Sequence, residues 1–116
     1  MKDADYSEFV ASRIKPPHEI NLPPAARNLL HMAVGVSTEA GELLSSVKAH
    51  VIYQKHLDIM NVIEELGDLE FYIEGLRQEL MLTRKLILEK NYEKLSKRYP
   101  SGAFSNQHAQ ERADKQ

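Results

Sequence analysis

The chain has 116 residues, of which 28% are charged and 42% hydrophobic, and its formal net charge at pH 7 is -2. This length allows one domain with a modest core, and the near-neutral charge argues against general binding to nucleic acid or to an anionic membrane surface. The absence of cysteine excludes disulfides, thiolate metal sites and a cysteine nucleophile. No apolar run is long enough for a membrane span and no leader peptide is recognisable, so we expect a soluble, cytoplasmic protein.

The first predicted elements are an arm and a long helix. Residues 1–20 are predicted to form an N-terminal arm, in which residues 6–13 could be a short helix before a pair of prolines interrupts the chain. The long helix is predicted to start at Pro23 or Pro24, because proline is tolerated in a first turn, and to run to about Val51. Its apolar stripe consists of Leu29, Met32, Val36, Ala40, Leu43 and Val47.

Two further helices follow a connection at residues 50–58. The second helix has Asp58 or Asn61 as its expected N-cap, and its apolar stripe is Ile59, Val62, Leu66, Leu69, Ile73, Leu76 and Leu80. A third helix is predicted from Thr83 as N-cap to a residue before Pro100, with candidate buried positions at Leu86, Ile87, Tyr92 and Leu95. Residues 101–116 are predicted to be a C-terminal tail that is ordered only if it packs on something.

These elements predict an all-α fold, because no segment has the period-two alternation of a β-strand. Residues 22–100 would form the helical core of a single domain that covers residues 1–116. Three helices with long apolar stripes bury them best by pairing with another copy, so we expect a helical bundle completed by homo-oligomerisation.

An acidic pattern of the form Glu-x-Gly-acid-Leu occurs on two of the predicted helices, at residues 39–43 and 65–69. Acids three residues apart project from nearly the same face of a helix, about 60° apart. Such pairs occur four times in the chain, whereas about two or three are expected by chance, so the spacing alone is not informative. The two pairs differ from the others because they border the apolar stripes.

The position of these acids predicts a metal. An acid at the edge of a core is costly unless it is paired or ligated, and four facing carboxylates repel one another unless a cation lies among them. Oxygen ligands without thiolates or paired histidines favour Mg²⁺ or Mn²⁺ over Zn²⁺. The predicted ligands are Glu39, Glu42, Glu65 and Asp68. The alternative interpretation is a set of half-exposed acids beside a bundle seam.

Each acidic pattern contains a glycine, Gly41 in the first and Gly67 in the second. Glycine inside a helix costs about 1 kcal/mol relative to alanine, which suggests close packing against another helix or subunit at both positions.

A basic face is predicted on the third helix, where Asn91, Lys94 and Arg98 are spaced at i, i+3 and i+7. Opposite a metal cluster, this amide and these two cations would hold phosphate oxygens, and Arg98 could bind them bidentately. The alternative is an ordinary solvated helix face. The coexistence of the acidic and basic faces favours phosphate binding.

Together these segments resemble the MazG-like family of all-α nucleoside triphosphate pyrophosphohydrolases. The family signature is an ExxE helix, a connection, an ExxD helix and a basic third helix. It corresponds here to Glu39-x-x-Glu42, to Glu65-x-x-Asp68 and to residues 90–100, which end in Arg98-Tyr99-Pro100. The resemblance covers roughly residues 29–104. This chain departs from the family between the second and third helices, where relatives often have a glycine turn and this chain has Leu80-Met81-Leu82.

The resemblance implies a Mg²⁺-dependent hydrolase of phosphoanhydrides that cleaves an NTP or dNTP to the monophosphate and pyrophosphate, as a homodimer or homotetramer. Carried over by position, the four carboxylates would bind the metal, and Glu39 or Glu42 would also serve as the general base. The phosphates would be contacted by Asn91, Lys94 and Arg98. Neither nucleic acid nor a membrane is expected as a partner.

Two alternatives stay open. One is a non-catalytic helical interaction module in which the acids and bases form interhelical salt bridges. The other is a related all-α pyrophosphatase of narrow specificity, of the dUTPase-like or phosphoribosyl-ATP type. No residue indicates the preferred base or sugar.

Overall fold

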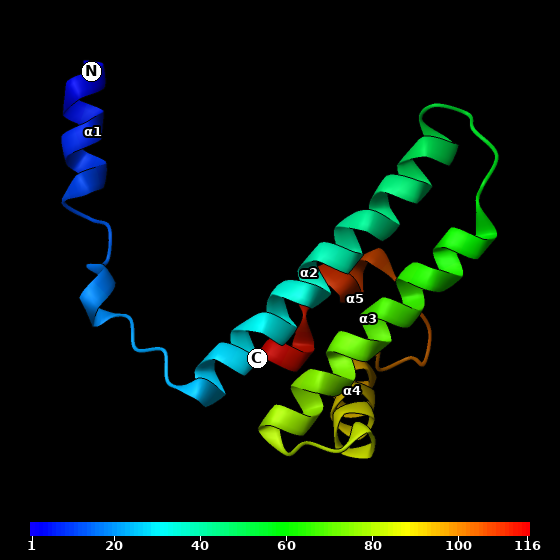
Figure 1. Cartoon of the computed structure of the whole chain (residues 1–116). Helices are drawn as coiled ribbons and strands as arrows, with labels where there is room; N and C mark the ends of the chain where they lie inside the picture. The colour runs from blue at the N-terminus through cyan, green and yellow to red at the C-terminus, as the bar shows by residue number, and fades with distance from the viewer.

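The computed structural model describes residues 1–116 and is entirely helical, with 74% of the residues in helical segments and no strands. The α-helices are α1 (Asp3–Ala11), α2 (Pro24–Val51), α3 (Ile59–Leu80), α4 (Arg84–Arg98) and α5 (Asn106–Glu111). Two 3-10 helices, η1 (Pro17–Glu19) and η2 (Ala113–Lys115), complete the chain (Figure 1). The all-α prediction is confirmed.

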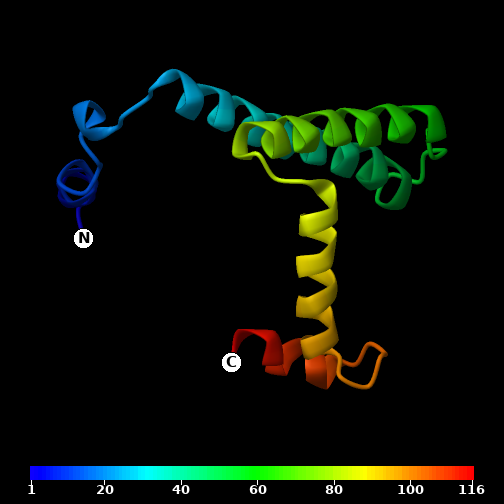
Figure 2. The ribbon, with the colours of Figure 1, turned by 90° about the horizontal axis from the view of Figure 1, so that it is seen from below.

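The centre of the fold is a hairpin of two long helices, α2 and α3, which lie side by side and antiparallel (Figures 1 and 2). Helix α2 has Pro23 at its N-cap and ends at Val51, as predicted. Helix α3 begins after Asp58, whose carboxylate accepts a hydrogen bond from the backbone N–H of Asn61 at 3.0 Å. This local hydrogen bond satisfies one of the free N–H groups of the first turn and fixes where α3 starts.

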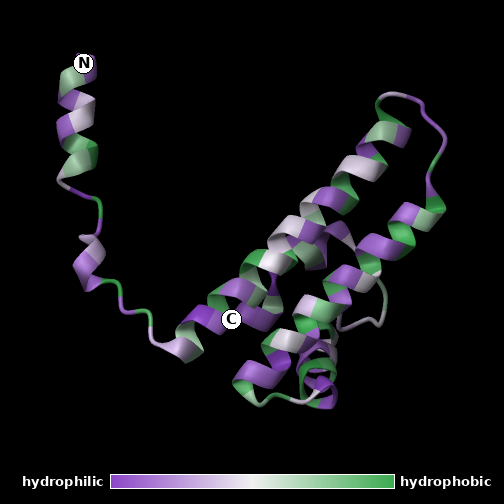
Figure 3. Ribbon diagram, viewed as in Figure 1, coloured by the Kyte–Doolittle hydropathy of each residue, from purple (hydrophilic) through white to green (hydrophobic).

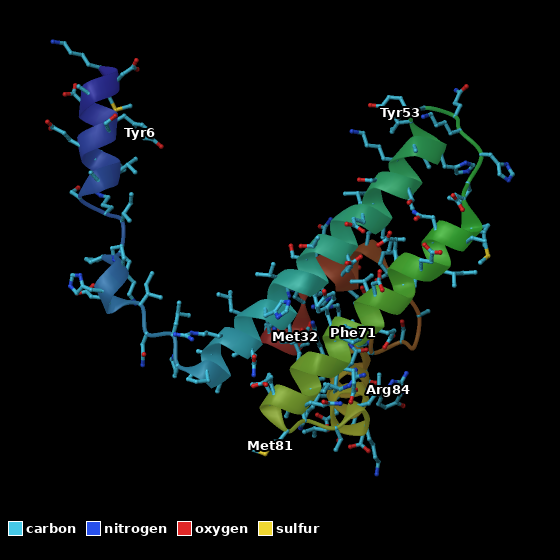
Figure 4. All side chains as sticks on the ribbon, in the orientation of Figure 1. Tyr6, Met32, Tyr53, Phe71, Met81 and Arg84 are labelled. Carbon is cyan, nitrogen blue, oxygen red and sulfur yellow. The ribbon has the colours of Figure 1, made fainter.

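Two glycines allow the hairpin to pack closely. A Cβ atom added to Gly35 would collide with the ring of Tyr72, and one added to Gly75 would collide with the sulfur of Met32. Each helix therefore provides a gap for a large side chain of the other (Met32 is labelled in Figure 4). The glycines of the acidic pattern have no such neighbour, since open space surrounds both Gly41 and Gly67. The predicted close packing at these two positions is not found within the chain.

The junction between α3 and α4 is a tight turn at Met81. This residue has a left-handed backbone conformation with φ of 53°. The N–H of Met81 donates a hydrogen bond to the carbonyl of Gln78, and the N–H of Leu82 donates one to the carbonyl of Arg77. These are the two hydrogen bonds of a Schellman motif, in which the left-handed residue, here Met81, is usually a glycine. Thr83 then caps α4, as predicted, by accepting from the N–H of Leu86 at 3.1 Å.

Helix α4 points away from the hairpin, and the C-terminal segment packs against its far end (Figure 2). Helix α1 stands apart from all other helices at the end of an extended segment (Figure 1). None of the helices combines the length and the apolar composition that crossing a bilayer requires.

The single chain has no closed hydrophobic core. No hydrophobic side chain is buried. Hydrophobic residues, which are green in Figure 3, recur along every long helix. The radius of gyration is 20.1 Å, whereas a compact domain of this length would have about 13 Å. Half-buried positions of the predicted stripes lie in the α2–α3 seam, including Met32, Val36, Leu43, Leu69 and Ile73.

Other predicted core positions are exposed, because only two long helices pack together within the chain. On α2 and α3 these are Ala40, Val47, Ile59, Leu66 and Leu80. The prediction of buried positions on α4 is wrong for one chain, since all four are exposed: Leu86, Ile87, Tyr92 and Leu95. No third element of the chain covers them in this structure.

Candidate metal centre

Three of the predicted metal ligands meet in the middle of the hairpin. Glu39 and Glu42 lie on α2, and Glu65 lies on α3. One carboxylate oxygen from each residue lies within 4.8 Å of the other two. The short connection between the antiparallel helices brings residues 26 positions apart in the sequence to the same level of the seam.

Burial differs strongly within this acidic cluster. Glu65 is 8% exposed, Glu39 is half-buried and Glu42 is exposed. This gradient follows the helical wheel, on which Glu39 borders the seam and Glu42 lies about 60° further out. The cluster therefore has a closed inner side formed by Glu65 and an outer side, at Glu42, that a ligand can reach.

The two inner carboxylates lack partners. The Oε2 atoms of Glu39 and Glu65 are buried and make no hydrogen bond. The ion pairs of the chain involve Glu74, Glu89, Glu93 and Asp114, so no Lys or Arg neutralises the cluster. Buried polar atoms are nearly always satisfied in folded proteins, and an unpaired buried carboxylate is especially costly. This arrangement calls for an additional ligand.

The electrostatics of the cluster agree with its geometry. The pKa of Glu65 is raised from 4.5 to about 7, first by the facing Glu39 carboxyl group, then by burial and by the neighbouring Glu42. Facing carboxyl groups hold a proton between them when no cation is present, because two like charges at this distance cannot both be ionised cheaply. A bound cation would reverse this effect and favour the charged forms.

The donor set fits a hard divalent cation. All three groups offer carboxylate oxygen, which is the ligand type of Mg²⁺ and Mn²⁺. Oxygens bound to one Mg²⁺ at about 2.0–2.1 Å lie up to about 4.2 Å apart, so small side-chain rotations would bring these three oxygens onto one ion. Three protein ligands would leave positions for water or phosphate oxygens.

The fourth predicted ligand, Asp68, is exposed and does not belong to the group of three. It lies one turn beyond Glu65 on α3. The chain thus brings together both acids of the first pattern and only the first acid of the second.

A polar contact beside the cluster was not found by sequence reasoning. The side-chain amide of Asn61 on α3 donates a hydrogen bond to the hydroxyl of Ser46 on α2. Ser46 lies one turn after Glu42, and Asn61 lies one turn before Glu65. This bond therefore ties the two helices together next to the carboxylates and helps to fix their register. The only sequence signal was the presence of two polar residues on otherwise apolar seam faces.

The basic face of α4 is not brought to the acidic cluster within one chain. Asn91 and Lys94 are exposed on a helix that points away from the hairpin (Figure 2). The third residue of this face, Arg98, is already engaged by Asp114 of η2, with Nε to Oδ1 at 2.8 Å and Nη2 to Oδ2 at 3.1 Å. The hydrogen bond from Arg98 lowers the pKa of the Asp114 carboxyl group below its usual value of 3.8.

Comparison with known proteins gives no relative: no family model, no curated protein and no solved structure matches this chain.

Proposed function

We propose that the protein is a Mg²⁺-dependent nucleoside triphosphate pyrophosphohydrolase of the MazG-like type. The observation that carries this proposal is the buried Glu65 carboxylate, which has an unsatisfied oxygen, no cationic partner and two further carboxylates beside it. A structural role alone does not explain the two inner acids, because Glu39 and Glu65 each hold a buried oxygen without a partner, which destabilises the fold. A metal-binding role explains all three.

The burial of each carboxylate suggests its role in metal binding or in proton transfer. Glu39 and Glu65 would hold the inner side of the ion, while the exposed Glu42 can reach both the ion and bulk water. Among the candidates for the general base, Glu42 is therefore better placed than Glu39 to accept a proton from an attacking water. When bound, Mg²⁺ would neutralise the polyphosphate and polarise that water. Asp68, one turn away, would complete the ligand set or orient metal-bound water.

The proposal includes a homo-oligomer. The chain exposes 9692 Å², whereas a compact monomer of 13.3 kDa would expose about 6,500 Å². The excess is of the size that obligate interfaces bury, and it coincides with the exposed apolar residues of α2, α3 and α4. In this proposal, a second copy packed on the hairpin supplies its own basic helix, with Asn91 and Lys94, to the acidic cluster, because α4 does not reach the cluster within one chain (Figure 2). These observations support a helical bundle in a homodimer or homotetramer as part of the proposal.

A non-catalytic interaction module is the second candidate, and the amount of exposed apolar surface on α4 favours it. The two candidates differ in their response to ligands. A ligand that binds only the folded state must raise its stability, so the enzyme requires a thermal shift with Mg²⁺ and a nucleoside triphosphate. The interaction module requires none.

The direct test is pyrophosphate release from a panel of nucleoside triphosphates in the presence of Mg²⁺. We expect activity in the unmodified chain, a loss of at least about 100-fold in Glu65→Gln, and little change in Glu70→Gln, which removes an exposed acid of α3 outside the cluster. Equal activity in both variants would refute the assignment of Glu65. No activity with any nucleotide, together with no thermal shift, would favour the interaction module.

A further inference from the structure

An aromatic groove lies at the far end of α4, remote from the acidic cluster. It is lined mainly by Leu88, Tyr92, Leu95, Tyr99 and Phe104. The chain turns back at Gly102, which has a left-handed φ of 80°, and this turn places the Phe104 ring 5.6 Å from that of Tyr99. Tyr92 is 76% exposed and Phe104 is 70% exposed. Exposed aromatic groups concentrated in a groove are typical of a surface that binds another protein segment.

The apolar face of α1 has the size and character to fill such a groove. Tyr6 and Phe9 stack on each other with ring centroids 6.2 Å apart, and Val10 shares their face at the i, i+4 spacing. Both rings are more than half exposed. No other helix lies near Tyr6 (Figure 4). Within the chain, the guanidinium of Arg13 covers one face of the Phe9 ring, with its carbon 3.7 Å from the ring centroid. No other helix covers the aromatic stripe that Tyr6 and Phe9 form (Figure 1).

Charge selects α4 as the receiving helix. Helix α1 has three acids and no base, whereas α4 has six bases and two acids. The alternative receiving helix, α3, has six acids and one base and would repel α1. On the wheel, Asp3 and Asp5 border the aromatic face of α1, while Arg84 and Lys85 border the groove face of α4. Complementary charges around an apolar centre favour this pairing over others.

The connection between α1 and α2 favours docking on another copy. The residues from 12 to 23 include Pro16, Pro17 and Pro23, and proline-rich segments behave as semi-rigid spacers. In the structure this segment, which includes η1, holds α1 away from the rest of its chain (Figures 1 and 2). Such a spacer resists folding back onto its own α4 and can bridge to a neighbour.

From these observations we propose that α1 of one copy docks, through Tyr6, Phe9 and Val10, in the aromatic groove of α4 of a second copy. This exchange of N-terminal arms requires neither metal nor substrate, and it places the arm beside Asn91, a residue of the basic face that also lines the groove. It gives the arm a defined role in assembly and gives the groove a defined occupant.

The absence of cysteine allows a cross-linking test on the whole 116-residue chain. Chains that carry only Val10→Cys are mixed with chains that carry only Ser96→Cys or only Ala103→Cys, since both Ser96 and Ala103 line the groove. The mixture is then exposed to mild oxidant. Docking brings the paired sulfurs within the short reach of a disulfide, so a covalent heterodimer is expected for at least one of the two pairs. Because surface charges contribute to docking, raising the salt concentration should reduce its yield.

The matched control is Glu8→Cys, which places the thiol on the opposite face of α1. The proposal predicts much less heterodimer from this variant with the same partners. It is overturned if the control cross-links equally well, or if neither pair gives a heterodimer. It is also overturned if a chain that carries both cysteines closes the disulfide only within itself, which would mean that the arm folds back on its own α4.

Discussion

Glu39 of α2 and Glu65 of α3 face each other across the helix seam with carboxylate oxygens within 4.8 Å, and no cationic side chain pairs with either. Their proximity follows from an antiparallel hairpin whose connection is short. It also makes the metal-free protein electrostatically strained at neutral pH, because both groups are acids in a partly dry environment. Several measurable properties depend on this one relationship.

The stability of the metal-free protein should fall as pH rises from about 5 to 8. The pKa of Glu65 is about 7 in the folded chain and has an ordinary value of 4.5, so the folded state holds its proton more tightly than the unfolded state. The contribution to stability is therefore full below pH 4.5 and is lost as pH rises through 7. Urea unfolding with a chelator present, at a series of pH values, measures this slope. In Glu65→Gln the slope should be reduced.

Replacing Gly35 or Gly41 of α2 with alanine should have opposite effects on stability, because only Gly35 is in close contact with Tyr72. Gly35→Ala should destabilise the protein by about 1–3 kcal/mol, because the added methyl group collides with the Tyr72 ring. Gly41→Ala, surrounded by open space, should stabilise a single chain by up to about 1 kcal/mol through its better helix propensity. Denaturant unfolding gives both values. If Gly41 instead lies against a second copy, its substitution would weaken the oligomer, which analytical ultracentrifugation would detect.

The ion pair between Arg98 and Asp114 should hold the C-terminal segment on α4. Their side chains are 17% and 2% exposed, so Asp114→Asn leaves a nearly buried guanidinium without its charged partner. Backbone amides of α5 and η2 should then exchange hydrogen faster, while those of α3 are unaffected. The same segment should loosen in acid, since the lowered pKa of Asp114 means that its stabilising effect is lost as pH falls below 3.8. Glu111→Gln, in the same segment but exposed, is the control.

Substitution of Met81 by glycine should stabilise the turn between α3 and α4. A non-glycine residue in the left-handed region costs about 1–2 kcal/mol, and the Met81 side chain is 90% exposed and contributes little packing. Met81→Gly should therefore raise the free energy of unfolding by about 1 kcal/mol, as measured by denaturant unfolding. A loss of stability would show that the Met81 side chain is buried in an interface.

Local signals in the sequence predicted where α2, α3 and α4 begin, but they placed the N-terminal helix at residues 6–13 instead of Asp3–Ala11 and did not predict α5. Pro24, Asp58 and Thr83 each determine a helix start through one residue and its immediate backbone, so no distant contact is needed. The meeting of Glu39, Glu42 and Glu65 was also predictable, because helical period and a short connection together fix which faces of a hairpin oppose each other.

Nonlocal contacts were not predictable in the same way. Sequence reasoning assigned Arg98 to phosphate and did not identify its partner Asp114, which lies 16 residues away in a segment without periodicity. It marked Gly41 and Gly67 rather than Gly35 and Gly75 as packing glycines, because the distinction depends on which large side chain faces each one. The exposure of the apolar face of α4 depends on where the turn at Met81 directs that helix.

The measurement that tests the central claim most directly is a Mg²⁺ titration of thermal stability at pH 8 for the unmodified chain, Glu65→Gln and Glu70→Gln. A ligand at 100 times its Kd stabilises the folded state by about 2.7 kcal/mol. If the acidic cluster is a metal site, Mg²⁺ raises Tm in the unmodified chain and in Glu70→Gln, and has little effect on Glu65→Gln. An equal rise in all three proteins, or no rise in any of them, would contradict the assignment of Glu39, Glu42 and Glu65 as metal ligands.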